Sequence, residues 1–151
     1  YSVSIISQPK LGVILSGKES GIRIMLYSQI SNHLSKAENN IKQSKVLFKH
    51  FVKNIERLNQ LFEEVFALRV DKLYQLNYVL FTLIWILRVQ KEEFVDKSEL
   101  PIGEIEKDEF SKRFIEKVQE NFNLAENQIE NEYIFRMLQS FNLQKSSTTV
   151  N

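Results

Sequence analysis

His33 and His50 are the two histidines of this 151-residue sequence, and histidine is the residue type best suited to metal binding or proton transfer. A metal site needs further ligands at defined spacing, such as a second histidine or a glutamate about one helical turn away. No His-x-x-x-His or Glu-x-x-His pair occurs, and the chain contains no cysteine. We therefore expect no metal site, no cofactor and no thiol chemistry, with both histidines at the borders of helical core faces.

Pairs of acidic residues are the other candidates for chemistry, for example Glu63-Glu64 and Glu92-Glu93. Paired carboxylates act as acid and base when an apolar cleft holds them. These pairs fall on expected helix surfaces or in an acidic loop, where a solvated surface is the simpler interpretation. The sequence also lacks a nucleophile elbow, a Walker loop and a dinucleotide-binding fingerprint. We predict that the chain is not an enzyme.

A row of basic residues is the clearest local charge pattern. Its members follow one another at steps of three or four residues along an expected helix. We call this row the basic ridge, and it consists of Lys42, Lys45, Lys49, Lys53 and Arg57. It could meet an acidic partner or a phosphate backbone, but it lacks the interleaved aromatic residues of single-strand binders. The solvated back of an amphipathic helix is the simpler interpretation.

Composition limits the remaining classes. The chain has 20 basic and 19 acidic residues, so its net charge of +1 gives no overall attraction to nucleic acid. Its longest apolar run, residues 79–87, is interrupted by Thr82 and is far shorter than the roughly 20 residues that cross a bilayer. No signal peptide opens the chain, which begins with Tyr1. We expect an internal part of a longer cytoplasmic protein with no membrane partner.

The elements that must position these residues are predicted from apolar periodicity. Two short β-branched stretches, residues 2–7 and 11–15, are typical of a hairpin that must pack on something else, because two strands alone are marginal in water. Five helices follow, starting near Ser20, Ile41, Asp71, Asp108 and Leu124. The second should end near Leu68, the acidic main loop should span 90–107, and the fifth helix should end near Phe141.

The third helix is expected to be the centre of the fold. Nearly every position of its second half, which includes Trp85, is apolar, and a helix that is apolar all round is enclosed on most sides. The scarcity of glycine (4) and proline (2) favours long helices with short connections. The predicted fold class is therefore all-α, a compact five-helix bundle preceded by a short N-terminal β-hairpin. Trp85 and the phenylalanines are interpreted as core rather than as a ligand cavity.

The stretch from Leu11 to Arg23 is the most informative part of the sequence. It resembles a junction in bacterial regulators that combine an N-terminal helix-turn-helix with a PTS regulation domain (PRD). In that junction a strand of the form Gly-x-x-Leu-x-Gly-x-Glu leads directly into a helix that begins x-x-Ile-Arg. The matching residues are Gly12, Leu15, Gly17, Glu19, Ile22 and Arg23.

Two later segments share the resemblance. Residues 73–88, LYQLNYVLFTLIWILR, are similar to the central PRD helix that ends in an arginine, here Arg88. Residues 126–140, ENQIENEYIFRMLQS, are similar to the last PRD helix, with Glu130 and Tyr133 at its Glu-x-x-Tyr positions. The resemblance therefore covers almost the whole chain and implies a PRD-like bundle.

The chain departs from this family at the residues that carry its chemistry. Sugar-controlled regulators of this class are phosphorylated on histidines in these two helices. The corresponding positions are Phe81 and Met137, and an apolar side chain cannot accept a phosphoryl group. This pattern is more similar to the Mga/RofA branch of virulence regulators, whose PRDs are degenerate.

The resemblance implies a regulatory and dimerisation domain of an Mga/RofA-like transcription regulator. Residues 1–19 would link a preceding helix-turn-helix region to the helical domain, 20–141, and 142–151 would form a flexible tail. DNA would be bound by domains outside the chain, and the implied partners are a second copy and a phosphotransferase-system protein, HPr or an enzyme II. Two alternatives stay open: direct nucleic-acid binding through the basic ridge, and a phosphorylated PRD that uses His33 or His50.

Overall fold

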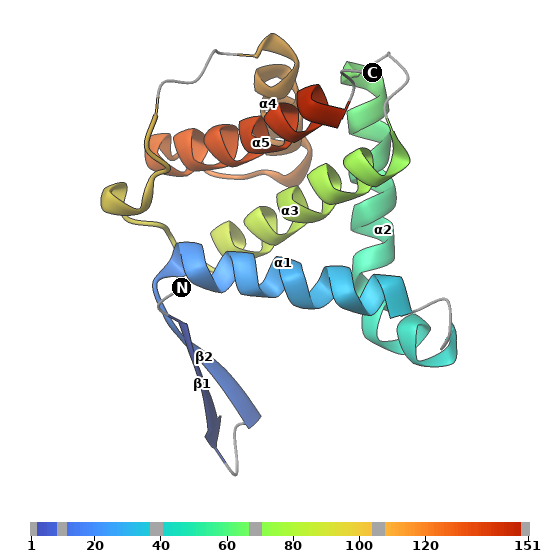
Figure 1. Ribbon diagram of the computed structural model, residues 1–151, viewed down its shortest axis with the longest axis vertical. Coiled ribbons are helices and arrows are strands. Elements are labelled where there is room, and N and C mark those ends of the chain that lie inside the picture. Colours follow the sequence, from blue (N-terminus) through green and yellow to red (C-terminus); the bar gives the residue numbers. More distant parts are fainter. Residues whose placement is uncertain (1–2, 9–11, 37–40, 67–70, 104–107, 149–151) are drawn as a thin grey trace.

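The chain folds as an all-α bundle of five helices with a β-hairpin at its N-terminus, as predicted (Figure 1). The computed structural model describes the backbone of residues 3–8, 12–36, 41–66, 71–103 and 108–148. It describes the side chains of residues 17–32, 52–66, 71–103 and 108–141. The helices are α1 (Glu19–Lys36), α2 (Ile41–Val65), α3 (Lys72–Gln90), α4 (Glu109–Phe122) and α5 (Gln128–Thr148).

The hairpin consists of β1 (Val3–Gln8) and β2 (Gly12–Gly17), which pair antiparallel with Val3 opposite Gly17 and Ile6 opposite Ile14. In Figure 1 it projects away from the helices at the start of α1. Gly17 closes β2 with a φ of 143°, a conformation that side-chain-bearing residues rarely adopt. The glycine therefore allows the chain to turn from strand to helix within two residues.

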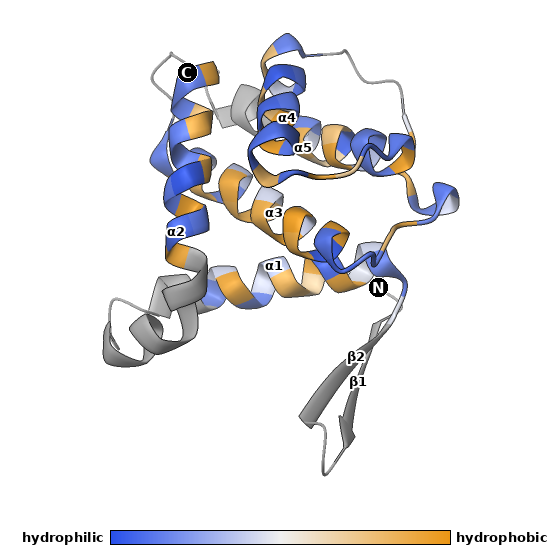
Figure 2. Cartoon of the chain, turned by 180° about the vertical axis from the view of Figure 1, so that it is seen from behind, coloured by the Kyte–Doolittle hydropathy of each residue, from blue (hydrophilic) through white to orange (hydrophobic). Residues whose placement is uncertain are grey.

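The central position of α3 is confirmed. Every residue from Tyr78 to Ile86 is buried, and the helix packs against α1, α2 and α5. Figure 2 shows it as the most continuously apolar helix, surrounded by helices with a polar outer side. Its two buried hydroxyl groups are satisfied, since Thr82 donates to the carbonyl of Tyr78 and Tyr78 donates to Ser111 on α4.

Asparagine and aspartate side chains set the helix ends. Two helices were predicted to start near Asp71 and Asp108, and these residues cap α3 and α4 by accepting from the backbone N–H two residues ahead. α4 ends at Phe122 and is followed by Asn123, which adopts the left-handed conformation of a helix C-cap. Asn127 then accepts from the N–H of Glu130, so α5 begins at Gln128 rather than near Leu124 as predicted.

Other helix ends also differ from the prediction. The second helix, α2, ends at Val65 rather than Leu68. The last helix, α5, continues to Thr148, beyond the predicted end at Phe141, and no glycine or proline interrupts residues 142–148. The expected main loop contains a 3-10 helix, Lys97–Glu99. The division of the chain into linker, helical domain and tail stays a prediction.

Candidate functional site

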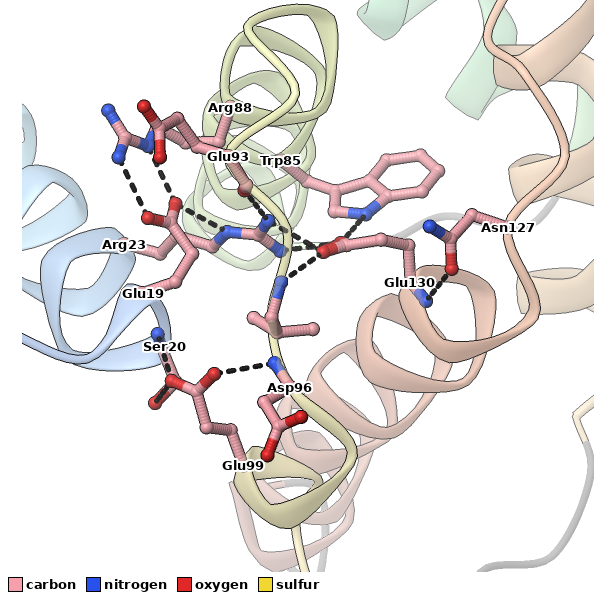
Figure 3. Close-up of polar contacts among 11 residues, drawn as sticks. Glu19, Ser20, Arg23, Trp85, Arg88, Glu93, Asp96, Glu99, Asn127 and Glu130 are labelled. Carbon is pink, nitrogen blue, oxygen red and sulfur yellow. Dashed lines mark hydrogen bonds and ion pairs between the residues drawn. The ribbon is translucent and has the colours of Figure 1, made fainter.

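Arg23, on the second turn of α1, is a charged residue with no solvent exposure, and it organises the most polar part of the interior. Its Nη1 and Nη2 atoms both donate to the Glu130 carboxylate on α5 at 2.8 Å. Nη2 also donates to the backbone carbonyl of Glu93, and Nε donates to Glu19 at 3.1 Å (Figure 3). A planar guanidinium suits this arrangement because its donors match a carboxylate in pairs.

Glu130 is as buried as Arg23, with 1% of its surface exposed. Besides the two bonds from Arg23, its carboxylate accepts from Trp85 Nε1 at 3.1 Å and from the backbone N–H of Val95 at 2.8 Å. The carboxylate thereby joins α1, α3, α5 and the segment after α3. Burial of a charge at this depth is tolerated because the group is both paired and fully hydrogen-bonded.

Glu19 extends the cluster toward the surface. Its carboxylate accepts from Arg88 Nε at 2.6 Å and from Arg88 Nη2 at 2.7 Å, and the Arg88 side chain is 19% exposed. The four charged residues alternate in sign from Glu130 through Arg23 and Glu19 to Arg88, so their charges cancel. We call these four residues the ion network. It lies at the start of α1, beside α3 and α5 (Figure 3).

The surroundings keep both arginines charged. Burial lowers the pKa of Arg23, but the hydrogen bonds and charge of Glu130 outweigh that effect and raise it overall. The hydrogen bond to Glu19 raises the pKa of Arg88. The guanidinium carbon of Arg23 also lies 4.9 Å from the centre of the Tyr133 ring, a cation–π contact. Both arginines of the ion network therefore carry a positive charge at neutral pH.

Glu99, in the 3-10 helix that follows α3, forms hydrogen bonds with the start of α1. Its carboxylate accepts from the backbone N–H and the hydroxyl of Ser20, both at 3.0 Å, and from the backbone N–H of Asp96. Burial raises the pKa of Glu99, but these hydrogen bonds outweigh burial and lower it overall. The carboxylate form therefore stabilises the contact between this loop and α1.

The contact between Glu99 and Ser20 should contribute to the stability of the fold in a way that depends on pH. Because the pKa of Glu99 is lowered by folding, its contribution is present above the ordinary value of 4.5 and is lost as pH falls through the folded value. Glu99→Gln should therefore lower the melting temperature at neutral pH and have a smaller effect well below pH 4.5. Thermal melts across this range, with Glu120→Gln at an exposed position as control, measure the difference. An equal loss at both ends of the range would contradict this account.

The chemistry of the ion network is that of a connector. Each charged group in it is already paired, so these residues offer no unpaired base or nucleophile. Across the described side chains, no group of three histidine, aspartate or glutamate residues is placed to hold a metal ion. None of the described helices has the length and apolar character needed to cross a bilayer. The network fixes the start of α1 relative to α3 and α5.

The residues that carry the family resemblance converge on this place. Glu19 and Arg23 come from the junction motif, Arg88 from the second segment, and Glu130 and Tyr133 from the third. Ile22, also of the junction motif, is buried, whereas the burial of Gly12 and the side chain of Leu15 lie outside what the structure describes. Sequence reasoning missed Trp85 as a hydrogen-bond donor and missed Glu99, although each lies in a segment it had singled out.

The two positions where the family has histidine lie in or beside the core. Phe81 is 2% exposed, and its ring contacts those of Tyr27 on α1 and of Tyr133 and Phe141 on α5. Met137, one helical turn from both α5 aromatics, packs against the same core. These side chains therefore contribute to packing between α1, α3 and α5.

The remaining candidates are only partly described. Of the basic ridge, Lys53 and Arg57 are exposed, and the Arg57 guanidinium donates to Gln60 and to Asn121 on α4. The other ridge side chains and both histidines lie outside the described residues: Lys42, Lys45, Lys49, His33 and His50. The structure brings none of the described ridge residues to the ion network.

No family model, no curated protein and no solved structure matches this chain. Its function has to be inferred from its own residues.

Proposed function

We propose that this chain is the regulatory and dimerisation domain of a bacterial DNA-binding transcription regulator of the Mga/RofA type. The carrying observation is the ion network, which ties the hairpin exit to α3 and α5 through Arg23, Arg88 and Glu130. Three separated segments had suggested the PRD resemblance, and their charged residues meet in this one cluster. Segments that belong to one structural motif are expected to bring their characteristic residues into contact in this way.

The placement of the network supports a mechanism. By resemblance, the DNA-binding domains lie before the hairpin and outside this chain. A dimer of the helical domain would fix the distance between two such domains and thus the half-site spacing they can read. Because α1 begins in the ion network, a shift of α3 or α5 would be passed to the hairpin through rigid, paired charges. A regulator of this kind acts in the cytoplasm.

Phe81 and Met137 support a domain that works without phosphorylation at the family positions. An apolar side chain has no atom to accept a phosphoryl group, and Phe81 is also enclosed by aromatic rings. If His33 or His50 served instead, incubation with phosphorylated HPr would add one phosphoryl group to the intact mass. Direct nucleic-acid binding through the basic ridge would instead give a gel shift that weakens steeply with salt.

The dimer is the part of the proposal that can be tested directly. We expect light scattering to give twice the chain mass at micromolar concentration. Fusion of the chain to a monomeric DNA-binding domain should also make that domain bind paired half-sites cooperatively. The same DNA-binding domain without the chain is the control. A monomer at all concentrations, with no gain in paired-site binding, would overturn the proposed function.

A further inference from the structure

A groove of about 640 Å³ lies between α4 and the beginning of α5, helices that pack side by side. Its volume falls within the range of about 300–1,000 Å³ that is usual for small-molecule sites. The α4 residues that line it, 112–119, extend about 10 Å along the helix. The groove therefore has room for a small ligand that contains one or two rings.

Two apolar side chains give the groove an apolar surface. Ile115 on α4 is buried, and Phe135 on α5 is half-buried against the hydrophobic core. The face of an aromatic ring carries a partial negative charge, which attracts the slightly positive C–H groups of a saturated ring. Ile115 and Phe135 thus provide a surface against which one face of a ligand ring can pack.

A pair of side-chain amides joins the two helices within the groove. Gln119 Nε2 on α4 donates to Asn131 Oδ1 on α5, and this bond sets the orientation of both amides. Gln119 Oε1 remains as an acceptor and the Asn131 NH₂ group as a donor, since neither makes another hydrogen bond to a described residue. Two neighbouring hydroxyl groups match this pair, because one can donate to Gln119 and the other can accept from Asn131.

The other polar side chains of the groove add both donors and acceptors. Four of them form no ion pair and no side-chain hydrogen bond with any described residue: Lys112, Glu116, Glu126 and Gln128. The remaining carboxylate, that of Glu132, pairs with Arg136 at 2.7 Å. The groove therefore offers an ammonium group, carboxylates and amides around an apolar surface.

This mixed lining favours an uncharged ligand. An anion would be repelled by Glu116 and Glu126, and a cation has no acceptor to offer to Lys112 or to the amide NH₂ groups. A hydroxyl group both donates and accepts, so it can pair with every polar group of the lining. Carboxylates already have this role in dinucleotide sites, where an acidic residue binds the ribose hydroxyl.

We propose that the groove between α4 and α5 binds an uncharged ring that carries neighbouring hydroxyl groups, either a free saccharide or the ribose of a nucleoside. The ring packs on Ile115 and Phe135, while its hydroxyl groups pair with Gln119 and Asn131 and with the free polar side chains at the edges. This inference goes beyond the proposed function and does not depend on the dimer.

Titration of the whole chain with three neutral probes tests the proposal. The probes are glucose, maltose and adenosine, and binding is followed by NMR. We expect at least one probe to bind with a dissociation constant in the millimolar range or below. It should shift the side-chain NH₂ signals of Gln119, Gln128 and Asn131 more than those elsewhere. Deoxyadenosine or fully methylated glucose, which lack the hydroxyl pair, should bind at least about tenfold more weakly than the parent compound.

A double variant of the groove tests its side chains. Glu126→Ala with Gln128→Ala removes two side chains that have no polar partner among the described residues, so the melting temperature should not change. Binding of the probe should weaken at least about tenfold, because two hydrogen bonds are lost. Glu120→Ala with Gln29→Ala is the matched control, since it makes the same truncations at exposed positions outside the groove. It should leave binding unchanged.

The remaining outcomes decide between ligands or overturn the proposal. Binding of maltose but not adenosine would identify a saccharide site, and the reverse would identify a nucleoside site. No binding of any probe at tens of millimolar, or binding that the groove variant leaves unchanged, would overturn the proposal. Tighter binding of the polyamine spermidine than of every neutral probe would assign the groove to a cation and also overturn it. None of these results affects the dimer, which light scattering tests separately.

Discussion

Glu130→Ala should lower the free energy of unfolding by about 3–5 kcal/mol, because it leaves the buried guanidinium of Arg23 without its main partner. Arg23 would keep Glu19 and the carbonyl of Glu93, but it would lose both of its 2.8 Å bonds to Glu130. The Trp85 N–H and the Val95 N–H would also lose their acceptor in a buried region. Urea unfolding followed by circular dichroism measures the change.

Glu132→Ala is the matched control for this prediction. Glu132 is on the same helix, and its carboxylate also pairs with an arginine, Arg136, but near the surface. Its removal should cost less than about 1 kcal/mol, since exposed ion pairs contribute little. A similar cost for both variants would mean that the burial of Glu130 does not govern its contribution.

A double-mutant cycle tests whether Arg23 and Glu130 act as a pair. Arg23→Met alone leaves a buried carboxylate, and Glu130→Ala alone leaves a buried guanidinium. The double variant has neither isolated charge, so it should be less destabilised than the sum of the two single variants. Recovery should be incomplete, because Trp85 and Val95 still lack an acceptor. Additive losses would show that the two charges do not depend on each other.

Those parts of the fold that depend on a strong local sequence pattern could be predicted from the sequence. The nearly continuous apolar surface of α3 predicted a central helix, and two helices were expected to start near Asp71 and Asp108, whose side chains do cap α3 and α4. The start of α5 was missed because two asparagines separate the helices within a few residues: Asn123 caps the end of α4, and Asn127 caps the start of α5. Apolar periodicity alone continues across such a connection and does not show where one helix stops.

The ion network was less accessible to sequence reasoning. Arg23 belongs to the junction motif in the sequence, but its burial depends on Glu130, which lies 107 residues further along the chain. No local pattern shows that a charged residue on a helix has a buried partner so distant. The segments that resemble PRDs contain all four residues of the ion network, but the resemblance does not show which of these residues contact one another. It could not indicate Glu99, which lies in the segment between α3 and α4, or the Trp85 N–H, whose acceptor Glu130 lies on α5.

Phe81→Ala is the second substitution with a large expected effect, about 3–5 kcal/mol, because a buried aromatic ring is removed and a cavity remains. Phe81 lies edge-on to Tyr27 with ring centres 5.7 Å apart, and edge-on to Phe141 at 6.0 Å. A third ring, that of Tyr133, lies 6.4 Å away. Its loss should therefore loosen α1 and α5 from α3 together. Denaturant unfolding gives the free energy, and hydrogen exchange should show faster opening in both helices.

The control is Phe94→Ala, which removes the same ring from a position that is 46% exposed and should cost much less. Phe81→Leu should recover most of the loss, since an apolar side chain of similar size fills much of the space. If Phe81→Ala were no more harmful than Phe94→Ala, the ring would not be a packing residue. Phe81 would then have to be considered for a role other than packing. A loss of the expected size would mean that the Phe81 ring holds α1 and α5 on α3 by packing.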